Sequence, residues 1–268
     1  MPAPHVPPRR FEPAASETAP PLPTDAERLA ACVRPAGRAV MAQQWGDLLF
    51  AHWRYPAEAI QATLPPGLFV DTHDGHAYLG VVPFAMRRVR PRGLPAVPGL
   101  SNFLELNLRT YVYDRAGVPG VWFYSLDANQ WLAVEIARTL FHLPYEHARM
   151  AMQRTPDGQI HFQSQRTRPR RGAVTTTLTY AAVGAPSQAA LGTLEFFLAE
   201  RYRLYAWSPT GLMRGAVAHS PYPLAPAALS ALDETLLALN GFSPTGRPPD
   251  HVVTSAGVSV DIFPLRHI

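Results

Sequence analysis

The segment at residues 105–127 constrains the fold most, because apolar and polar side chains alternate along it. Successive side chains on a β-strand point to opposite faces of the sheet, so such alternation is typical of strands with one face in the core. A loop rich in glycine and proline divides the segment. The sequence therefore predicts an antiparallel hairpin of two strands, at residues 105–113 and 121–127.

One face of this predicted hairpin carries polar and aromatic side chains and is a candidate ligand site. A loop centred near residues 116–117 places Arg109 opposite Ser125 and Asn107 opposite Asp127. The same face then also carries Glu105, Tyr111 and Phe123. A polar face either meets solvent, as is usual for a half-buried antiparallel sheet, or lines the inside of a barrel. The mixture of polar types favours a lined pocket, in which Arg109 would hold a carboxylate through two hydrogen bonds.

Strand patterns outnumber helical ones along the rest of the chain. The dipeptide Asp74-Gly75 is typical of a tight hairpin turn, and it lies between strands predicted at residues 68–71 and 77–83. Further strands are predicted at residues 160–166, 175–181, 204–207, 212–218 and 252–263. Apolar spacing and cap residues predict helices at residues 129–141, 194–203 and 227–239. The expected fold class is α+β, mainly antiparallel β, with a large sheet or barrel and a few helices packed outside.

The first 40 residues contain nine prolines and little apolar periodicity. A segment of this kind buries too little surface to offset its ordering entropy, so residues 1–40 are expected to be a disordered tail, with a short helix at residues 25–32. One domain is expected over residues 41–268. The chain shows no membrane-length apolar run and no signal segment, and its one cysteine cannot form an internal disulfide. We therefore expect a cytoplasmic protein with no membrane partner.

Lysine is absent from the chain, so all 24 Lys+Arg residues are arginine. A Schiff-base mechanism needs a primary amine that can lose its proton, and arginine does not provide one. The pI of about 9.5 invites a nucleic-acid interpretation, and arginines cluster at residues 87–92 and 166–171. No nucleic-acid motif accompanies either cluster, so no nucleic-acid partner is expected.

Other patterns for metals, cofactors and catalysis are weak. Acidic residues and histidines at residues 71–76 flank a turn, where such side chains are usually solvated, and Pro144 breaks any metalloprotease helix between His142 and His147. Hydrolase and nucleotide-binding glycine motifs are absent, so we expect no metal and no cofactor. His219 follows a predicted strand, either as a proton carrier at a pocket mouth or as a hydrogen-bonded loop residue. Glu200 and Arg201 join a pocket only if they turn inwards, since charges at a helix end are commonly structural.

Several motifs stand in a fixed order: LLFAHW at residues 48–53, LPPGL at 64–68, GVVPF at 80–84, ELNLRTYV at 105–112, GVWFYSLD at 120–127, LPY at 143–145 and ERY at 200–202. Together they resemble a bacterial family, the YqjF-like family or domain of unknown function 2071, which is grouped with the acetoacetate decarboxylase-like superfamily. The resemblance covers roughly residues 41–265. It implies one cone-shaped antiparallel β-barrel around a polar ligand pocket, with helices packed outside.

The resemblance also implies a position for the reactive group. Decarboxylases of the superfamily carry a glutamate at a strand end, then a helix, then a Pro-Lys pair whose lysine forms the Schiff base. The corresponding order here is Asp127, the helix at residues 129–141 and Pro144-Tyr145, which places Tyr145 where the amine would be. A phenol can donate a proton but cannot form an imine.

Two functional hypotheses follow. In the first, the protein binds a small polar carboxylate or carbonyl compound and performs lyase- or isomerase-like proton transfer without a Schiff base. In the second, it is a non-catalytic small-molecule sensor. In the first hypothesis the acids or bases would be Tyr145, Asp127 and His219. The candidate ligand-binding residues are Arg109, Asn107, Ser125, Tyr111, Glu200 and Arg201. The oligomeric state stays open, and a homo-oligomer is compatible with the sequence.

Overall fold

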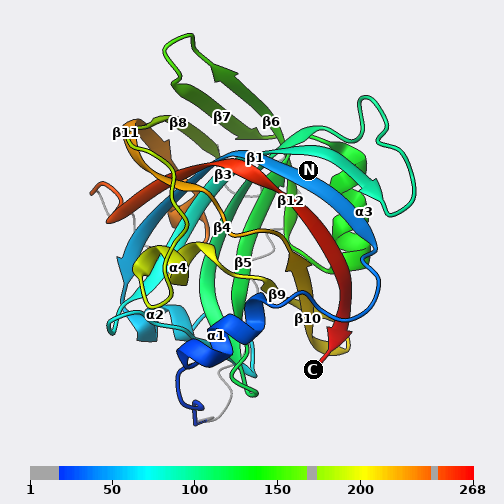
Figure 1. The fold of residues 1–268 in the computed structure, drawn as a ribbon, viewed down its shortest axis with the longest axis vertical. Coiled ribbons are helices and arrows are strands. Elements are labelled where there is room, and N and C mark those ends of the chain that lie inside the picture. Colours follow the sequence, from blue (N-terminus) through cyan, green and yellow to red (C-terminus); the bar gives the residue numbers. More distant parts are fainter. Residues whose placement is uncertain (1–17, 168–173, 243–246) are drawn as a thin grey trace, which may run out of the picture.

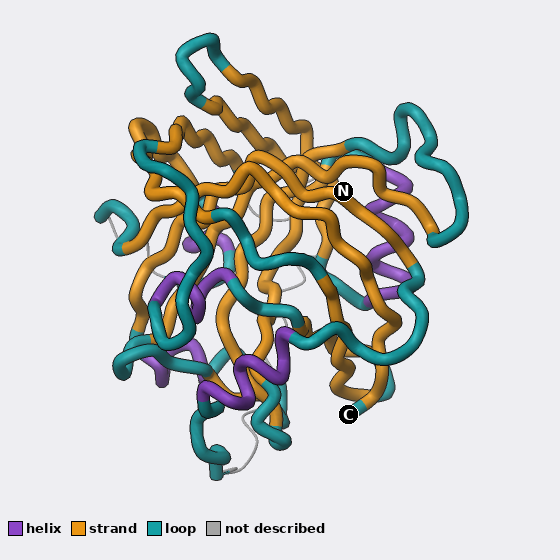
Figure 2. Tube along the Cα trace, viewed as in Figure 1, coloured by secondary structure: helices purple, strands orange, loops and turns teal. Residues whose placement is uncertain are grey.

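The computed structural model describes residues 18–167, 174–242 and 247–268, and strands dominate these residues (Figure 1). The strands are β1 (Met41–Tyr55), β2 (Leu68–Val70), β3 (Ala77–Pro91), β4 (Phe103–Asp114), β5 (Pro119–Ala128), β6 (Tyr145–Arg154), β7 (Ile160–Arg166), β8 (Thr175–Ala182), β9 (Arg203–Ser208), β10 (Gly211–Ala218), β11 (Leu224–Glu234) and β12 (His251–His267). The helices are α1 (Asp25–Cys32), α2 (Ala57–Gln61), α3 (Trp131–Phe141), α4 (Leu194–Ala199) and α5 (Leu236–Leu239). The predicted α+β class with mainly antiparallel strands is confirmed, and Figure 2 shows how few segments are helical.

The strand pairings form a closed circuit. β5 pairs with β4, and the pairings continue through β3, β1, β12 and β10 to β9, which pairs in parallel with β5 again. A second set of strands, β6, β7, β8 and β11, leaves this ring at β5 and returns to it at β12. The strands therefore surround an interior onto which several of them present side chains.

The central strands are buried on both faces, so the sheet has an apolar core on each side. On β3, Val82 and Phe84 belong to one cluster, whereas Leu79 and Val81 belong to another. The first cluster takes side chains from β1, β3, β10 and β12, which lie around the ring, so it fills the ring interior and is called the ring core here. The second cluster packs β1, β3 and β4 against β7 and β8 and is called the outer core.

The predicted hairpin at residues 105–127 exists, but its register differs from the prediction. Arg109 pairs with Phe123, and beyond an irregularity at that point Leu108 pairs with Ser125. A slip of one residue turns a side chain to the opposite face of the sheet. The predicted pairs of Arg109 with Ser125 and of Asn107 with Asp127 are therefore wrong, because a β-bulge adds a residue to β5 that the alternation alone does not reveal.

Three further elements differ in type, partner or length. The predicted helix at residues 227–239 is mostly strand β11, because residues 227–234 pair with β8, and only Leu236–Leu239 is helical. The turn at Asp74-Gly75 is present with positive φ angles of 49° and 76°, but β2 pairs with β4 rather than with β3. The predicted helix at residues 194–203 starts after its Thr193 cap as expected and ends at Ala199.

Residues 18–40 of the predicted disordered tail instead lie against the sheet. Thr24 and Glu27 form a reciprocal capping box that starts α1, and the Arg28 guanidinium donates two hydrogen bonds to Asp71 at 2.7 and 2.8 Å. Local capping and a buried ion pair thus hold a proline-rich segment whose composition predicts disorder. Residues 1–17 of that predicted tail lie outside the described residues. In the part of the chain that the structure describes, no helix is long and apolar enough to span a membrane.

Candidate functional site

A row of polar side chains on β4 faces the ring core. Alternate residues of a strand share a face at roughly 7 Å spacing, which aligns Glu105, Asn107, Arg109 and Tyr111. Glu105 and Asn107 pair across the sheet with Phe84 and Val82 of the ring core. Both are nearly inaccessible, at 3% and 4% exposure, whereas Arg109 is half-buried. This polar row brings together an acid, an amide, a cation and a phenol in an otherwise apolar interior.

Glu105 forms a hydrogen-bonded pair with Tyr145. The Tyr145 hydroxyl donates to Glu105 Oε2 at 2.7 Å. Burial raises the pKa of Glu105 to about 7, although the hydrogen bonds from Tyr145 and Asn107 act in the opposite direction. Burial and the neighbouring Glu105 hold the pKa of Tyr145 well above its ordinary value, so the phenol keeps its proton. The pair therefore combines a phenol that stays protonated and donates a hydrogen bond with a carboxyl group that gains and loses its proton near neutral pH.

Local structure fixes Tyr145 in this place. The residue starts β6, which pairs in parallel with β5 so that Tyr145 lies beside Leu126. Helix α3 makes the crossover between these two strands, and Arg138 near its end donates from Nε to the Tyr145 carbonyl at 2.6 Å. The strand, helix and tyrosine thus follow one another in the order that the resemblance implies.

Arg109 is a half-buried cation that has no carboxylate partner among the described residues. Its Nη2 donates to the Leu198 carbonyl at 3.0 Å, and its Nε donates to the Tyr111 hydroxyl at 3.3 Å. The guanidinium also lies over the Phe50 and Tyr111 rings, at 5.4 and 5.5 Å from their centroids. Because a partly desolvated cation is stabilised by an opposite charge, Arg109 is suited to receive an anionic ligand.

A chain of polar groups, hydrogen-bonded as far as His251, leads from Arg109 towards the surface. Tyr111 Oη lies 2.6 Å from His52 Nε2, His52 Nδ1 lies 3.2 Å from His251 Nδ1, and His251 Nε2 lies 3.6 Å from Glu195 Oε1. His52 is completely buried, while the Glu195 side chain is 44% exposed. Gly80 leaves room for this chain, since a Cβ there would lie 2.9 Å from the His52 ring.

The direction of this chain follows from Arg109. Arg109 Nε can only donate, so the Tyr111 hydroxyl accepts from it and gives its own proton to His52 Nε2. Neutral His52 then carries its proton on Nδ1 and donates it to His251 Nδ1. Burial lowers the pKa of both histidines, which fits this neutral arrangement. His251 consequently presents Nε2–H towards the carboxylate of Glu195.

Asp127 and Ser125 do not join this constellation. Both are buried, but the observed register turns them to the face shared by Leu106 and Leu108 in the outer core. Arg166 donates to both Asp127 carboxylate oxygens, from Nε at 2.9 and 3.0 Å and from Nη2 at 2.7 Å. Asp127 thus forms a buried ion pair with Arg166. Ser125 Oγ has no hydrogen-bond partner among the described residues.

Glu200 and Arg201 turn inwards, but each is held by protein groups. Glu200 accepts from the Tyr202 hydroxyl at 2.7 Å and from the Tyr222 backbone N–H at 2.9 Å. Arg201 forms a buried ion pair with Asp71 at 2.7 Å, on the same carboxylate that binds Arg28. These contacts join the chain after α4 to α1 and to the strand ends.

His219 lies against the ring core rather than in an open loop. Its ring stacks on Tyr202 with centroids 4.2 Å apart, and its Nδ1 lies 2.7 Å from the Ser220 carbonyl. Burial lowers the pKa of His219 to about 4, so the imidazole is neutral at neutral pH. Its Nε2 is buried without a partner in the described residues, which leaves it available as a hydrogen-bonding atom.

Comparison with known proteins places the chain among its relatives. The family model for domain of unknown function 2071, described as an uncharacterised conserved protein, matches residues 42–259. The uncharacterised protein YqjF of Bacillus subtilis (strain 168) is 37% identical over 233 residues, which cover 87% of this chain and 94% of YqjF. The chain belongs to the YqjF-like family.

Solved structures similar to this YqjF-like protein are distant in sequence and show its fold. The enduracididine biosynthesis enzyme MppR, complexed with pyruvate, gives a TM-score of 0.62 at 14% identity, covering 86% of this chain and 91% of that one. An acetoacetate decarboxylase-like enzyme from Sphingomonas wittichii RW1 gives 0.59 at 16% identity, covering 87% and 94%. Acetoacetate decarboxylase from Legionella pneumophila gives 0.58 at 12% identity, covering 94% and 98%. The expected acetoacetate decarboxylase-like fold is confirmed.

Part of the site in this YqjF-like protein is not evident from the sequence. Alternation places Glu105 on the polar face but indicates no role for it, because neither its burial nor its contact with Tyr145 can be predicted from local spacing. His52 and His251 carry no signal of their contact, since they are 199 positions apart and meet because β1 pairs with β12. The available signal was a histidine within the apolar motif LLFAHW, where a buried polar group needs a partner. In the described residues, no three histidine, cysteine or acidic side chains are grouped to hold a metal ion.

Proposed function

We propose that this YqjF-like protein binds a small organic carboxylate or carbonyl compound inside its ring of strands and transfers a proton on it without forming an imine. The observation that carries this proposal is the buried Glu105 carboxyl group, whose pKa is about 7 and which accepts a hydrogen bond from Tyr145. A general base works best when its pKa lies near the working pH, and a carboxyl group reaches that range only in an environment like this one.

Arg109 supports an anionic ligand. Its guanidinium has donors committed to one carbonyl and one phenol but no carboxylate among the described residues. A carboxylate of the ligand would supply that missing charge through charge-assisted hydrogen bonds. Asn107 lies between Arg109 and Glu105 on the same strand face, and its Oδ1 is buried without a partner in the described residues. It would therefore accept a hydrogen bond from a hydroxyl group of the ligand or of its enol form.

The proposed step is an enolisation. The Glu105 carboxylate accepts a proton from the carbon next to the ligand's carbonyl group, and the electron pair of that C–H bond moves to form the enolate. Return of the proton to the same carbon restores the ligand, and its delivery to another atom gives an isomer. Tyr145 holds the Glu105 carboxyl group in position and stabilises its ionised form. The chain from Tyr111 through His52 to His251 would support binding by fixing the Tyr111 hydroxyl beside Arg109.

The first probe is pyruvate, the ligand present in the MppR structure, because it is a small carboxylate with exchangeable C–H protons. Purified protein is incubated with pyruvate in heavy water, and loss of the methyl proton signal is followed by NMR. We expect wild-type protein to accelerate exchange, Glu105→Gln to slow it at least about 100-fold, and Arg109→Ala to weaken pyruvate binding at least about tenfold.

Matched controls separate these effects from general damage. Glu58→Gln removes an exposed carboxylate on α2, and Tyr180→Phe removes a buried phenol that donates to the Asp47 carbonyl. Both control variants should catalyse pyruvate proton exchange at the wild-type rate, whereas Tyr145→Phe should catalyse it more slowly. Saturable pyruvate binding without any exchange would overturn the catalytic proposal and favour a non-catalytic sensor. Exchange that persists at full rate in Glu105→Gln would refute the role of Glu105.

A further inference from the structure

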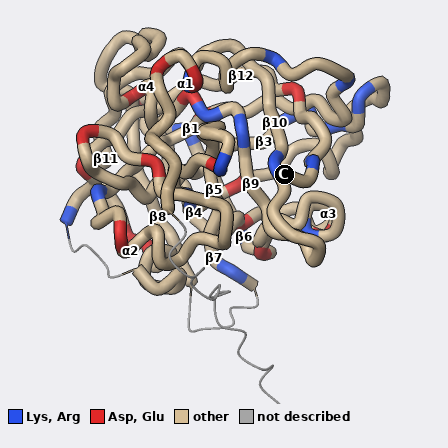
Figure 3. Tube along the Cα trace, turned by 90° about the horizontal axis from the view of Figure 1, so that it is seen from below, with Lys and Arg blue, Asp and Glu red and all other residues tan. Residues whose placement is uncertain are grey.

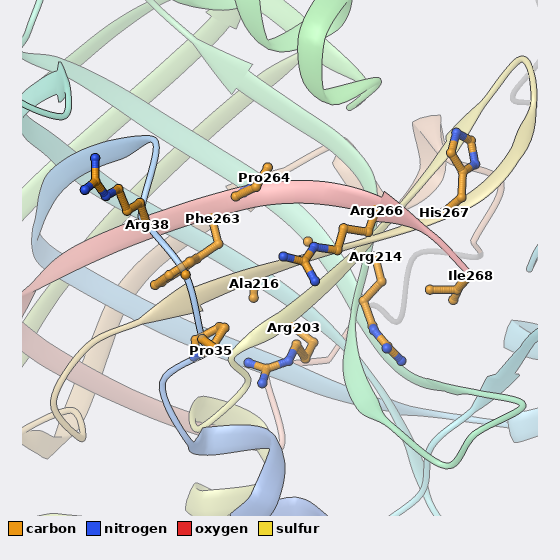
Figure 4. Close-up of a pocket in the computed structure, with 13 residues that line it drawn as sticks. Pro35, Arg38, Arg203, Arg214, Ala216, Phe263, Pro264, Arg266, His267 and Ile268 are labelled. Atoms are coloured by element: carbon orange, nitrogen blue, oxygen red, sulfur yellow. The ribbon is translucent and has the colours of Figure 1, made fainter.

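An arginine-lined cleft of about 390 Å³ lies outside the ring, away from the polar row on β4. Its walls come from the segment after α1, from β9 and β10, and from the end of β12 (Figure 4). Four arginines line it, namely Arg38, Arg203, Arg214 and Arg266. Apolar side chains, including Ala216 and Phe263, form part of the lining between them. We call this feature the arginine cleft.

The cations of the arginine cleft outnumber the anions that the protein supplies. No aspartate or glutamate of the described residues lines it. Arg214 forms an ion pair with Asp114, and Arg203 donates to two backbone carbonyls, those of Tyr202 and Val33. The side chains of Arg38 and Arg266 are exposed and have no hydrogen-bond or ion-pair partner in the part of the chain that the structure describes. At least two guanidinium groups are thus free to bind a ligand.

The arginines also repel one another, which an anion would relieve. The pKa of Arg203 is lowered chiefly by burial and next by the charge of Arg214. The nearby carboxylate of Asp261 does not compensate, because it is already shared by Arg34 and Arg92. Figure 3 shows arginine positions, in blue, gathered around β9, β10 and the end of the chain.

We propose that the arginine cleft binds a small phosphorylated compound, with phosphoryl oxygens on Arg203 and Arg266 and with Arg38, whose side chain points away from these two in Figure 4, turning in from the rim. A guanidinium presents paired N–H donors that match phosphoryl oxygens, and several arginines favour a group that carries more than one negative charge. The apolar lining at Ala216 and Phe263 would contact the rest of such a molecule. This site is separate from Arg109 and Glu105, so it stands or falls independently of the proposed function.

Pyrophosphate is a suitable probe because it carries the phosphoryl chemistry without an organic body. Calorimetric titration of the full chain in about 150 mM NaCl should show saturable binding at one site, since this salt concentration screens diffuse surface attraction. The double variant Arg38→Ala/Arg266→Ala should weaken pyrophosphate binding at least about tenfold. Both side chains are exposed, so the thermal unfolding midpoint should change little.

The matched control removes the same charge elsewhere. Arg54 and Arg149 are exposed arginines outside the cleft, and Arg54→Ala/Arg149→Ala should leave pyrophosphate affinity within about threefold of wild type. Equal weakening by both double variants would show only diffuse attraction and overturn the proposal. Absence of saturable binding to the wild type would overturn it too. Sulfate binding as tight as pyrophosphate binding would reject the phosphoryl specificity.

Discussion

Replacement of Glu105 by glutamine should change how the stability of the protein depends on pH. The Glu105 side chain is almost fully buried, and its pKa rises from an ordinary 4.5 to about 7 in the folded protein. At about 1.4 kcal/mol per pKa unit, this difference between the folded and unfolded states corresponds to about 3 kcal/mol of unfolding free energy. Glutamine keeps the shape and the acceptor for Tyr145, and its amide donates to Asn107 Oδ1 once the Asn107 side-chain amide turns over, because Asn107 now donates to Glu105.

The sign follows from proton binding. Between pH 4.5 and about 7 the folded state holds the Glu105 proton while the unfolded state has lost it. The Glu105 contribution to the free energy of unfolding therefore falls as pH rises through this window, and above it the contribution stays lower by about 3 kcal/mol. Glu105→Gln lacks this loss, so its stability relative to wild type should increase by about 3 kcal/mol from about pH 4.5 to pH 8.

Urea denaturation at a series of pH values measures this difference directly. Glu58→Gln, which alters an exposed carboxylate, serves as the control and should give a curve parallel to wild type. A constant difference in unfolding free energy between Glu105→Gln and wild type across the whole range would refute the raised pKa of Glu105.

Two further predictions test the surroundings of the site. Arg166→Ala leaves the Asp127 carboxylate, at 1% exposure, without its bidentate partner, so it should lower the free energy of unfolding by about 3–5 kcal/mol, as measured by urea denaturation. Adding Asp127→Asn should recover part of this loss, and an unchanged stability in Arg166→Ala would contradict the ion pair. Nitrogen NMR of the imidazoles should find the proton of His52 on Nδ1 and that of His251 on Nε2, and Tyr111→Phe should alter the His52 signals. A His52 proton on Nε2 would contradict the deduced direction of the hydrogen bonds from Tyr111 to His251.

The sequence predicts much of the fold where local patterns and tertiary structure agree. The strand at residues 160–166 and the helix near residues 129–141 are found as β7 and α3, because alternation and apolar spacing there match the pairing that the chain adopts. Residues 227–239 show the opposite case, since hydrogen bonding of residues 227–234 to β8 overrides helical spacing. Segment 18–40 is held by Arg28 and Asp71, a contact between residues 43 positions apart.

The site was predictable only in its residue types. Alternation correctly places Asn107, Arg109 and Tyr111 on one face, and the resemblance directs attention to Tyr145. The bulge in β5 moves Asp127 and Ser125 to the other face, and no local pattern shows the extra residue. Glu105, rather than Asp127, is hydrogen-bonded to Tyr145 because β6 places Tyr145 beside it, which depends on the crossover through α3.

The most direct test of proton transfer by Glu105 is the pH dependence of pyruvate proton exchange in heavy water. Because the ionised carboxylate is the proposed base, the exchange rate should rise with pH and reach half its maximum near pH 7, the pKa of Glu105. The rise should be absent in Glu105→Gln and intact in Glu58→Gln. A midpoint near 4.5, or the same rise in Glu105→Gln, would contradict the account.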